Sequence, residues 1–327
     1  MPRPLRIEYA GACFHVINRG NYRRNLFAGS GVAAAFERTL AEAAERFHWR
    51  IHAYVVMNNH FHLAVQIAEL NLSDGMKWLQ GTWIRRSNSL RRLAGRPFQG
   101  RYKALLVQPG PAFAQVCHYI HLNPVRARLV PPAQAIKYSA GSLPRFCERK
   151  RPTWLHASVL LHEAGGLNDT PTGWRKYLTY LEFLAQDEPS KKILVAARLS
   201  KGWCVGAAKF KAEIMQGMAD RSTVEERFAG LEPATVRAER AASWEKRLVA
   251  FAKAGKIDLT KLGRQKSHPD KVQLAAAMKQ SSSVSNRWLA TRLGMGQPAS
   301  ASQFVRRHLL TKEGQAASTS LLSRVKI

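Results

Sequence analysis

The sequence predicts an α+β protein in which a ferredoxin-like βαββαβ domain precedes a mainly α-helical C-terminal extension with a helix-turn-helix-like unit. Three observations lead to this prediction. Strand-like and helix-like segments follow one another in the order β-α-β-β-α-β as far as Leu122. Gly, Asn and Pro residues separate these segments. Near the C-terminus, short helical segments flank a glycine turn, which is the order of a helix-turn-helix.

The elements of the first domain follow from apolar periodicity. Apolar, strand-like segments predict strands at residues 13–18, 50–56, 60–67 and 102–108. Helical periodicity predicts helices at residues 32–47, from Ser73 to about Leu93, and at 112–122. Ser73 is the expected N-cap of the second helix, and Pro124 is expected to end the third. Both crossover helices should cover one face of the sheet, which leaves the other face open for a site.

Beyond residue 152, the chain is expected to be mainly helical. Residues 127–152 predict a poorly structured basic connector. Short helices at 272–278, 286–293 and 302–310, with Gly294-Met295-Gly296 before the last, predict the helix-turn-helix-like unit, for which an ordinary three-helix bundle is the alternative. The predicted domains are residues 1–150, a helical extension and basic linker at 151–269, the helix-turn-helix-like unit at 270–312, and a mobile tail at 313–327.

The charge of the chain points to a polyanionic partner. Its 327 residues carry 51 Lys and Arg against 22 Asp and Glu, a net charge of +29. Residues 1–150 hold 22 basic and 7 acidic side chains (+15), and the remainder holds 29 and 15 (+14), so the charge is not confined to a tail. Between Asp74 and Glu148 there are 12 Lys or Arg and no carboxylate. This stretch predicts either a generic basic surface or a channel that follows a phosphate backbone, and both interpretations predict nucleic acid.

Other classes are disfavoured. We see neither an apolar stretch of membrane-spanning length nor a secretion signal near Met1, and we expect a cytoplasmic, nucleoid-associated protein without a membrane partner. The cysteines, at positions 13, 117, 147 and 204, form no Cys-x-x-Cys pair and suggest reduced thiols.

Two histidines mark a candidate metal site. His60 and His62 lie two residues apart in a predicted strand and therefore project from the same face. Two neighbouring imidazoles can bind a divalent metal, although half-exposed strand histidines without a metal are an equally good interpretation. We interpret His15, His52, His118 and His121 as structural or phosphate-contacting residues rather than ligands.

Tyr119 and Asn123 could complete the site. They are four residues apart on a predicted helix and share a face. If that helix crosses the open face of the sheet, an amide oxygen joins the two imidazoles, a set that suits Mg²⁺ or Mn²⁺. The alternatives are a core aromatic for Tyr119 and a simple helix-end residue for Asn123.

Four motifs resemble the single-tyrosine transposases of the HUH (His-hydrophobic-His) class, and most of all the REP-associated tyrosine transposase branch. They occur in the family's order across about residues 1–150, and the resemblance is much weaker beyond. The motifs are Phe14-His15-Val16-Ile17-Asn18-Arg19-Gly20-Asn21, Met57-Asn58-Asn59-His60-Phe61-His62-Leu63, Phe98-Gln99-Gly100-Arg101-Tyr102-Lys103-Ala104 and Tyr119-Ile120-His121-Leu122-Asn123-Pro124-Val125-Arg126-Ala127.

The resemblance implies a ferredoxin-like domain that nicks and rejoins single-stranded DNA. It implies His60 and His62 as metal ligands, Asn123 as the third ligand and Tyr119 as the nucleophile, and all four positions are filled. Single-stranded or hairpin DNA is then the expected partner, with homodimerisation left open. Phosphate contacts are expected from Arg19, Arg85, Arg86, Arg101, Lys103, Arg126 and Arg128, and from Arg306 and Arg307 in the C-terminal unit.

Two alternative functions stay open. A catalytically idle repressor or architectural protein would use the same basic surface, but it would not need all four site residues. An HUH replication initiator or relaxase is the other, and the absence of a Gly-x-x-x-x-Gly-Lys-Ser/Thr motif argues against a helicase-fused form.

Overall fold

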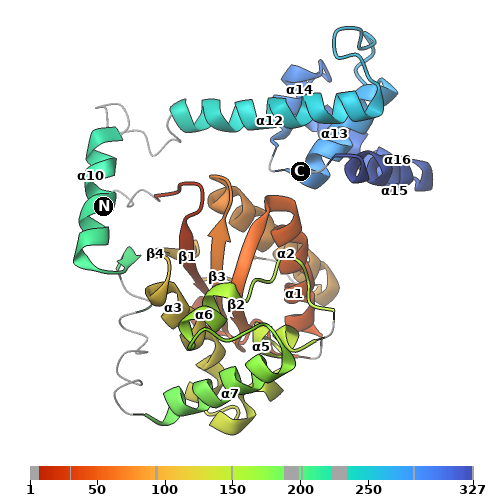
Figure 1. Ribbon diagram of the computed structural model, residues 1–327. Helices are drawn as coiled ribbons and strands as arrows, with labels where there is room; N and C mark the ends of the chain where they lie inside the picture. Colours follow the sequence, from red (N-terminus) through yellow and green to blue (C-terminus); the bar gives the residue numbers. More distant parts are fainter. Residues whose placement is uncertain are drawn as a thin grey trace. The chain divides into compact units, whose positions relative to one another are not determined.

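The chain forms two structural units, which are described separately. The computed structural model describes residues 7–29, 31–92, 95–148, 150–187, 199, 202–221, 234–282 and 284–325. The units are Met1–Arg227 and Phe228–Ile327 (Figure 1). Within the described residues, no helix combines the length and the apolar character needed to cross a membrane.

The first unit is built on a sheet with the order β2-β3-β1-β4-β5. Its first four strands are antiparallel neighbours and, with helices α1 and α2, confirm the predicted βαββαβ order. The strands are β1 (Cys13–Arg19), β2 (Trp49–Val56), β3 (His60–Ile67), β4 (Lys103–Val107) and β5 (Cys204–Val205). Strand β5 was not predicted. It has only two residues and pairs parallel to β4.

Helices α1 (Val32–Phe47) and α2 (Leu72–Arg91) form one layer on the sheet (Figure 1). An aromatic cluster fills the space beneath them. Phe36 of α1 lies 4.8 Å from Phe61 of β3, and Trp83 of α2 lies 4.9 Å from Phe27, between ring centroids. Burying each ring removes a large apolar surface from water and stabilises the fold by roughly 1.5–3 kcal/mol.

The start of α2 differs from the prediction. Ser73 lies inside the first turn, and Asn71 occupies the N-cap position without a side-chain capping bond. The carboxylate of Glu8 accepts hydrogen bonds from the backbone N–H groups of Leu72 and Ser73, at 3.0 and 3.1 Å, and from the Ser73 hydroxyl. A carboxylate from a distant segment therefore satisfies the free N–H groups of this helix, in place of a local cap. The predicted helix end, near Leu93, lies outside the described residues.

The opposite face of the sheet carries α3 (Pro111–His121), followed by the short helix α4 (Asn123–Arg126). A buried hydrogen-bond network fixes α3. The Tyr177 hydroxyl, on α7 (Pro171–Gln186), bonds His118 Nδ1 at 3.0 Å and His121 Nδ1 at 2.9 Å. His121 Nε2 also bonds the Ser142 hydroxyl at 2.9 Å. The prediction that His118 and His121 are structural is consistent with these contacts.

Residues 127–152 contain ordered elements, so the prediction of a poorly structured connector is wrong for its described residues. They form a 3-10 helix, η2 (Pro132–Lys137), and α5 (Ser142–Phe146). The Ser142 hydroxyl accepts from the Tyr54 N–H at 2.9 Å, and Val56 N–H donates to the Ala140 carbonyl at 2.9 Å. These bonds hold the segment along the edge of β2. Among its described residues, the unit also contains a 3-10 helix, η1 (Asn21–Arg23), and helices α6 (Ser158–Glu163) and α10 (Ala208–Arg221).

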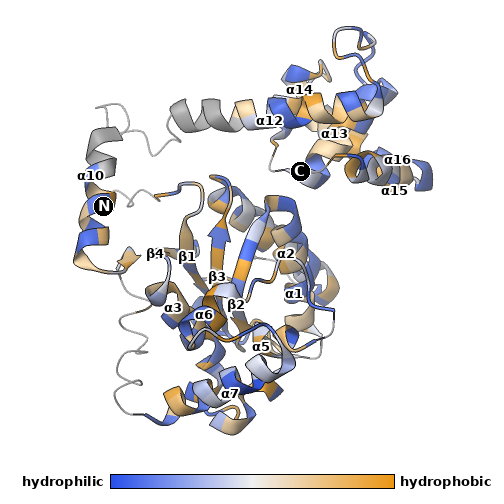
Figure 2. Cartoon of the chain, viewed as in Figure 1, coloured by the Kyte–Doolittle hydropathy of each residue, from blue (hydrophilic) through white to orange (hydrophobic). Residues whose placement is uncertain are grey.

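The second unit is helical and has its own core. Leu248 and Phe251 of α12 pack there with Leu274 and Met278 of α13. Its helices are α12 (Ala234–Gly255), α13 (Pro269–Ser281), α14 (Asn286–Arg292), α15 (Pro298–Leu310) and α16 (Lys312–Ser323). The helices of both units carry hydrophobic and hydrophilic bands, as expected for helices that pack by one face (Figure 2).

Helices α14 and α15 are joined by the predicted glycine turn, where Gly294 and Gly296 adopt positive φ angles of 60° and 83°. The expected mobile tail is instead helix α16. The Thr311 side chain caps this helix by accepting from the Gly314 N–H at 3.1 Å. Leu321 is buried in the core of the unit, so apolar contact as well as capping stabilises the segment.

Candidate active site

The site is built on strand β3, where the alternation of side chains places His60 and His62 on the same face. Their ring centroids are 5.0 Å apart. In the register of the sheet, Arg19 of β1 pairs with His60 and Ile17 pairs with His62. His62 is buried and His60 is half-buried, so the pair runs from the interior of the domain to its surface.

Tyr119 projects from α3 toward these histidines. Its ring centroid lies 5.5 Å from that of His62, and its hydroxyl forms a hydrogen bond with the Asn123 side chain. The structure therefore brings the strand histidines, Tyr119 and Asn123 together, as the sequence predicted. Their chemical roles remain predictions.

Asn123 reaches this position in an unexpected way. Helix α3 ends at His121, shortly before Pro124, as the sequence predicted, but after a bend at Leu122 a new helical segment, α4, begins at Asn123. Proline lacks an N–H donor, and the first turn of a helix needs none, so Pro124 is well placed there. The path stays helical, since Arg126 N–H donates to the Leu122 carbonyl at 2.9 Å.

Burial keeps the titratable groups of the site neutral. Desolvation, with a smaller effect from the Arg19 charge, lowers the pKa of His60 to about 4. Desolvation also lowers the pKa of His15 to about 4 and that of His62 well below its usual value. It raises the pKa of Tyr119, which the Arg126 charge and the Asn123 hydrogen bond partly oppose. At neutral pH the imidazoles are therefore available as ligands, and the phenol keeps its proton.

The donor set fits a divalent metal ion. His60 Nδ1 lies 2.6 Å from the Asn59 side-chain oxygen, which can only accept, so Nδ1 carries the proton and Nε2 carries the lone pair. A metal-binding histidine usually donates its other ring N–H to such an oxygen. With His62 and the Asn123 amide oxygen, His60 provides a set of nitrogen and oxygen ligands that Mg²⁺ or Mn²⁺ accepts. The described residues contain no group of three or more His, Cys, Asp or Glu side chains with a metal-binding arrangement, so a metal here would need the Asn123 amide oxygen as well as the two histidines.

The sequence predicted a structural or phosphate-contacting role for His15 but did not place it against His62. His15 projects from β1, is fully buried, and stacks on His62 with ring centroids 5.1 Å apart. His15 Nε2 lies 2.9 Å from His62 Nδ1, and His15 Nδ1 lies 2.6 Å from the Leu199 carbonyl oxygen. Strand parity could have placed His15 on the face of the histidine pair, once the register of β1 with β3 was known. The contact with Leu199 has no local sequence signal.

Several of the predicted phosphate-contacting residues surround this site and are exposed. Arg19 pairs with His60, and Lys103 pairs with Ile17 on the same face. The guanidinium of Arg126 lies 5.3 Å from the centre of the Tyr119 ring. Arg101 and Arg128 are exposed on the segments that precede β4 and follow α4.

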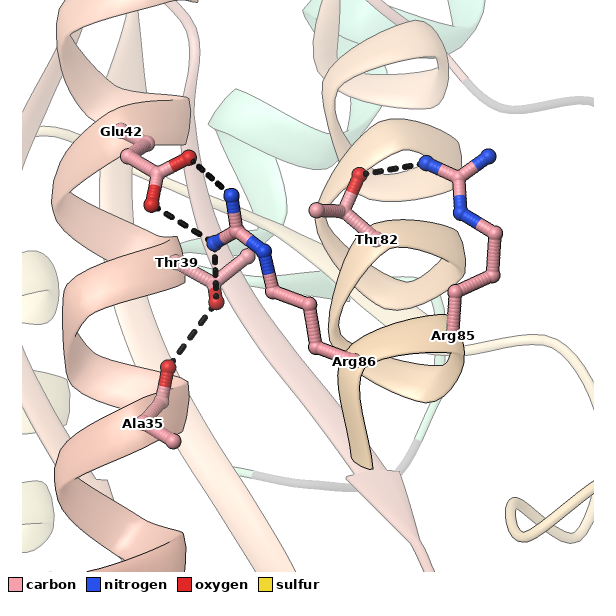
Figure 3. Close-up of polar contacts among 6 residues, drawn as sticks. All are labelled: Ala35, Thr39, Glu42, Thr82, Arg85 and Arg86. Carbon is pink, nitrogen blue, oxygen red and sulfur yellow. Dashed lines mark hydrogen bonds and ion pairs between the residues drawn. The ribbon is translucent and has the colours of Figure 1, made fainter. Parts of the chain in front are cut away.

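Arg85 and Arg86 belong to the helix layer on the other face of the sheet. The guanidinium of Arg86 forms a two-bond ion pair with Glu42 of α1, at 2.6 and 2.9 Å, and donates to the Thr39 hydroxyl (Figure 3). Arg85 donates to the Thr82 hydroxyl at 3.3 Å (Figure 3). The Arg86 contacts join α2 to α1, whereas the Arg85 contact lies within α2. A phosphate-binding role for either residue remains a prediction. In the second unit, Arg306 and Arg307 are exposed on α15.

Comparison with known proteins relates the segment that carries the site to a described family. Residues 9–123 match the model of the family described as "Transposase IS200 like". This segment contains all four site residues and is similar to IS200-like transposases, which confirms the predicted resemblance. Transposases as a class act on DNA and cleave it.

One solved structure similar to this chain is described as "Structure of the REP associates tyrosine transposase bound to a REP hairpin". The two are 17% identical, and the match covers 49% of this chain and 92% of that one with a TM-score of 0.38. No curated protein matches the chain.

Proposed function

We propose that this protein nicks single-stranded DNA and transfers the cut strand through a 5′-phosphotyrosine on Tyr119, with hairpin-forming repeats as its targets. The observation that carries the proposal is the position of the Tyr119 hydroxyl. It bonds Asn123, and its ring lies against His62, at one end of a neutral pair of histidines. A tyrosine used only for packing would not need two candidate metal ligands beside it.

The chemistry is a transesterification. The Tyr119 oxygen forms a bond to phosphorus, the bond from phosphorus to the 3′ oxygen breaks, and the phenol proton ends on the released 3′ hydroxyl. The phosphodiester energy is retained, so a second hydroxyl can later attack the phosphotyrosine and rejoin a strand. Because burial raises the pKa of Tyr119, the phenol is a weak nucleophile by itself.

The residues of the site divide the remaining tasks. His60, His62 and Asn123 would hold a divalent metal ion, Mg²⁺ or Mn²⁺. When bound, such an ion supplies positive charge to the phosphate oxygens and lowers the barrier to attack. The Arg126 guanidinium, next to the Tyr119 ring, favours the phenolate and also attracts the phosphate.

The test is covalent capture of DNA. A labelled single-stranded hairpin is incubated with the protein and Mg²⁺ or Mn²⁺, and products are separated on a denaturing gel. We expect a nicked strand and a protein–DNA adduct from the unmodified protein. Tyr119→Phe should give neither, while its DNA affinity stays within a few-fold, because only the attacking oxygen is lost.

Tyr22→Phe is the matched control. Tyr22 is 83% exposed on the loop after β1 and is an accessible alternative nucleophile. Its substitution should leave the adduct unchanged. An adduct that persists in Tyr119→Phe would remove Tyr119 from the mechanism. No adduct from the unmodified protein with either metal would favour a DNA-binding role without cleavage.

A further inference from the structure

We propose that His15 is a positioning residue that sets which ring nitrogen His62 presents to the metal ion. The inference rests on the proposed function, because it assumes that His62 is a ligand. What it adds to the proposed function can be tested without DNA cleavage. It concerns the position of one proton on His62 and the group that holds it there.

The Leu199 carbonyl determines which nitrogen of His15 carries the proton. A carbonyl oxygen can only accept, so the 2.6 Å contact requires that His15 Nδ1 carry a proton. His15 is fully buried, and none of the partners seen in its contacts is a carboxylate that would stabilise an imidazolium. A neutral imidazole has one N–H, so His15 Nε2 carries a lone pair and must accept.

The lone pair on His15 Nε2 in turn determines which nitrogen of His62 carries the proton. Its Nδ1 lies 2.9 Å from the accepting Nε2 of His15, so His62 Nδ1–H is the donor of this bond. The lone pair of neutral His62 is therefore on Nε2, which is the ligating nitrogen. Two hydrogen bonds in series fix this tautomer, and the stacking of the two rings, inclined at 26°, fixes the orientation of His62.

His60 has the same tautomer, but a different hydrogen bond fixes it. Its Nδ1–H donates to the side-chain oxygen of Asn59, a neighbour in sequence. Both candidate ligands therefore bind through Nε2. The half-buried His60 donates to the side chain of its neighbour Asn59. The buried His62 depends on His15 of β1 and, through it, on the backbone carbonyl of Leu199. Groups that hold ligating histidines in this way typically affect metal affinity 10–100-fold when they are replaced.

Two full-length variants separate the role of His15 in hydrogen bonding from its role in packing. His15→Phe keeps a ring of similar size but removes the acceptor. His15→Gln places an amide oxygen near the former Nε2 and can still accept from His62 Nδ1–H. Each is measured without DNA, first by Mn²⁺ affinity from electron paramagnetic resonance and then by the ¹⁵N chemical shifts of the His62 ring in the metal-free protein.

We expect His15→Phe to weaken Mn²⁺ binding roughly 10–100-fold and to abolish the single Nδ1–H form of His62. His15→Gln should restore both to within a few-fold of the unmodified protein. Circular dichroism identifies a variant that has lost its fold. An unchanged His62 tautomer and Mn²⁺ affinity in His15→Phe would overturn the inference, as would a folded His15→Gln that behaves like His15→Phe.

Failure of the proposed function would look different. If the unmodified protein bound no Mn²⁺, the metal site itself would be refuted. The His62 tautomer would still be readable in the metal-free protein and would test the action of His15 by itself.

Discussion

Tyr177 should be a main determinant of the position of helix α3, and Tyr177→Phe tests this. The substitution removes a single oxygen atom and leaves the buried ring in place. That oxygen bonds His118 Nδ1 at 3.0 Å and His121 Nδ1 at 2.9 Å, and both histidines are only 3% exposed. A hydroxyl has one proton, so it donates to one imidazole and accepts from the other.

The cost follows from the loss of both partners. A buried polar group that is left without a hydrogen bond costs about 1–3 kcal/mol, so two such groups cost about 2–6 kcal/mol. The loss should appear where the histidines lie, on α3. Since 1.4 kcal/mol corresponds to a factor of ten, amide hydrogen exchange in α3 should accelerate by at least about thirty-fold and by at most about ten-thousand-fold.

The assay is hydrogen–deuterium exchange followed by mass spectrometry of peptides from α3. Tyr180→Phe is the control, because Tyr180 lies one turn further along α7 and contacts His118 through its ring, with centroids 5.4 Å apart. Equal exchange rates in the two variants would refute the reasoning and would show that the two hydrogen bonds contribute little to the stability of α3.

Four further predictions follow from the site, the charge and the helices. His60→Ala and EDTA should each abolish nicking, and Asn123→Ala should weaken the response to metal less, since a neutral amide is a poorer ligand; full activity in EDTA would exclude the metal site. Affinity for single-stranded DNA should fall with salt with a slope of roughly −3, for about four phosphate contacts, whereas a flat dependence would exclude a phosphate-following surface. Acid should destabilise the fold between about pH 6.5 and pH 4, because in this range the histidines become protonated in the unfolded chain while the buried histidines of the folded protein stay neutral. His15 alone, with its pKa lowered to about 4, contributes about 3 kcal/mol, and a pH-independent urea midpoint would contradict this. Replacing both Arg306 and Arg307 with Ala should weaken binding to DNA with a duplex stem but leave nicking of a short single strand intact; equal affinity for the stem would make α15 a packing helix.

The order of elements in the first domain could be predicted because each carries its own periodic signal. Alternation across β3 placed His60 and His62 on the same face, and the four-residue spacing brought Tyr119 near Asn123, even though a bend at Leu122 separates their helices. Local patterns of this kind survive in the fold because they depend on neighbours in sequence.

The remainder depends on contacts between distant segments. Ser73 has the chemistry of a helix cap, yet the carboxylate of Glu8 binds the free N–H groups of α2. Strand β5 is too short for periodicity to reveal, and it exists because β4 offers it hydrogen bonds. The contact of His15 with Leu199 joins residues 184 positions apart through a backbone oxygen, which every residue possesses and no sequence motif identifies.

In the group of four strands β2-β3-β1-β4, both outer strands are hydrogen-bonded to chain that follows the segment matched by the transposase family. On β4, the Leu106 and Gln108 N–H groups donate to the carbonyls of Trp203 and Val205, at 2.9 and 2.8 Å. On β2, the Ile51 N–H donates to Trp154 at 2.9 Å, and the Ile51 carbonyl accepts from His156 at 2.8 Å. An uncovered edge strand exposes unpaired peptide groups to which another chain can add. A fragment limited to residues 9–123 would keep His60, His62, Tyr119 and Asn123 but expose both edges, and we expect it to aggregate by strand pairing between molecules, whereas the longer unit stays monodisperse.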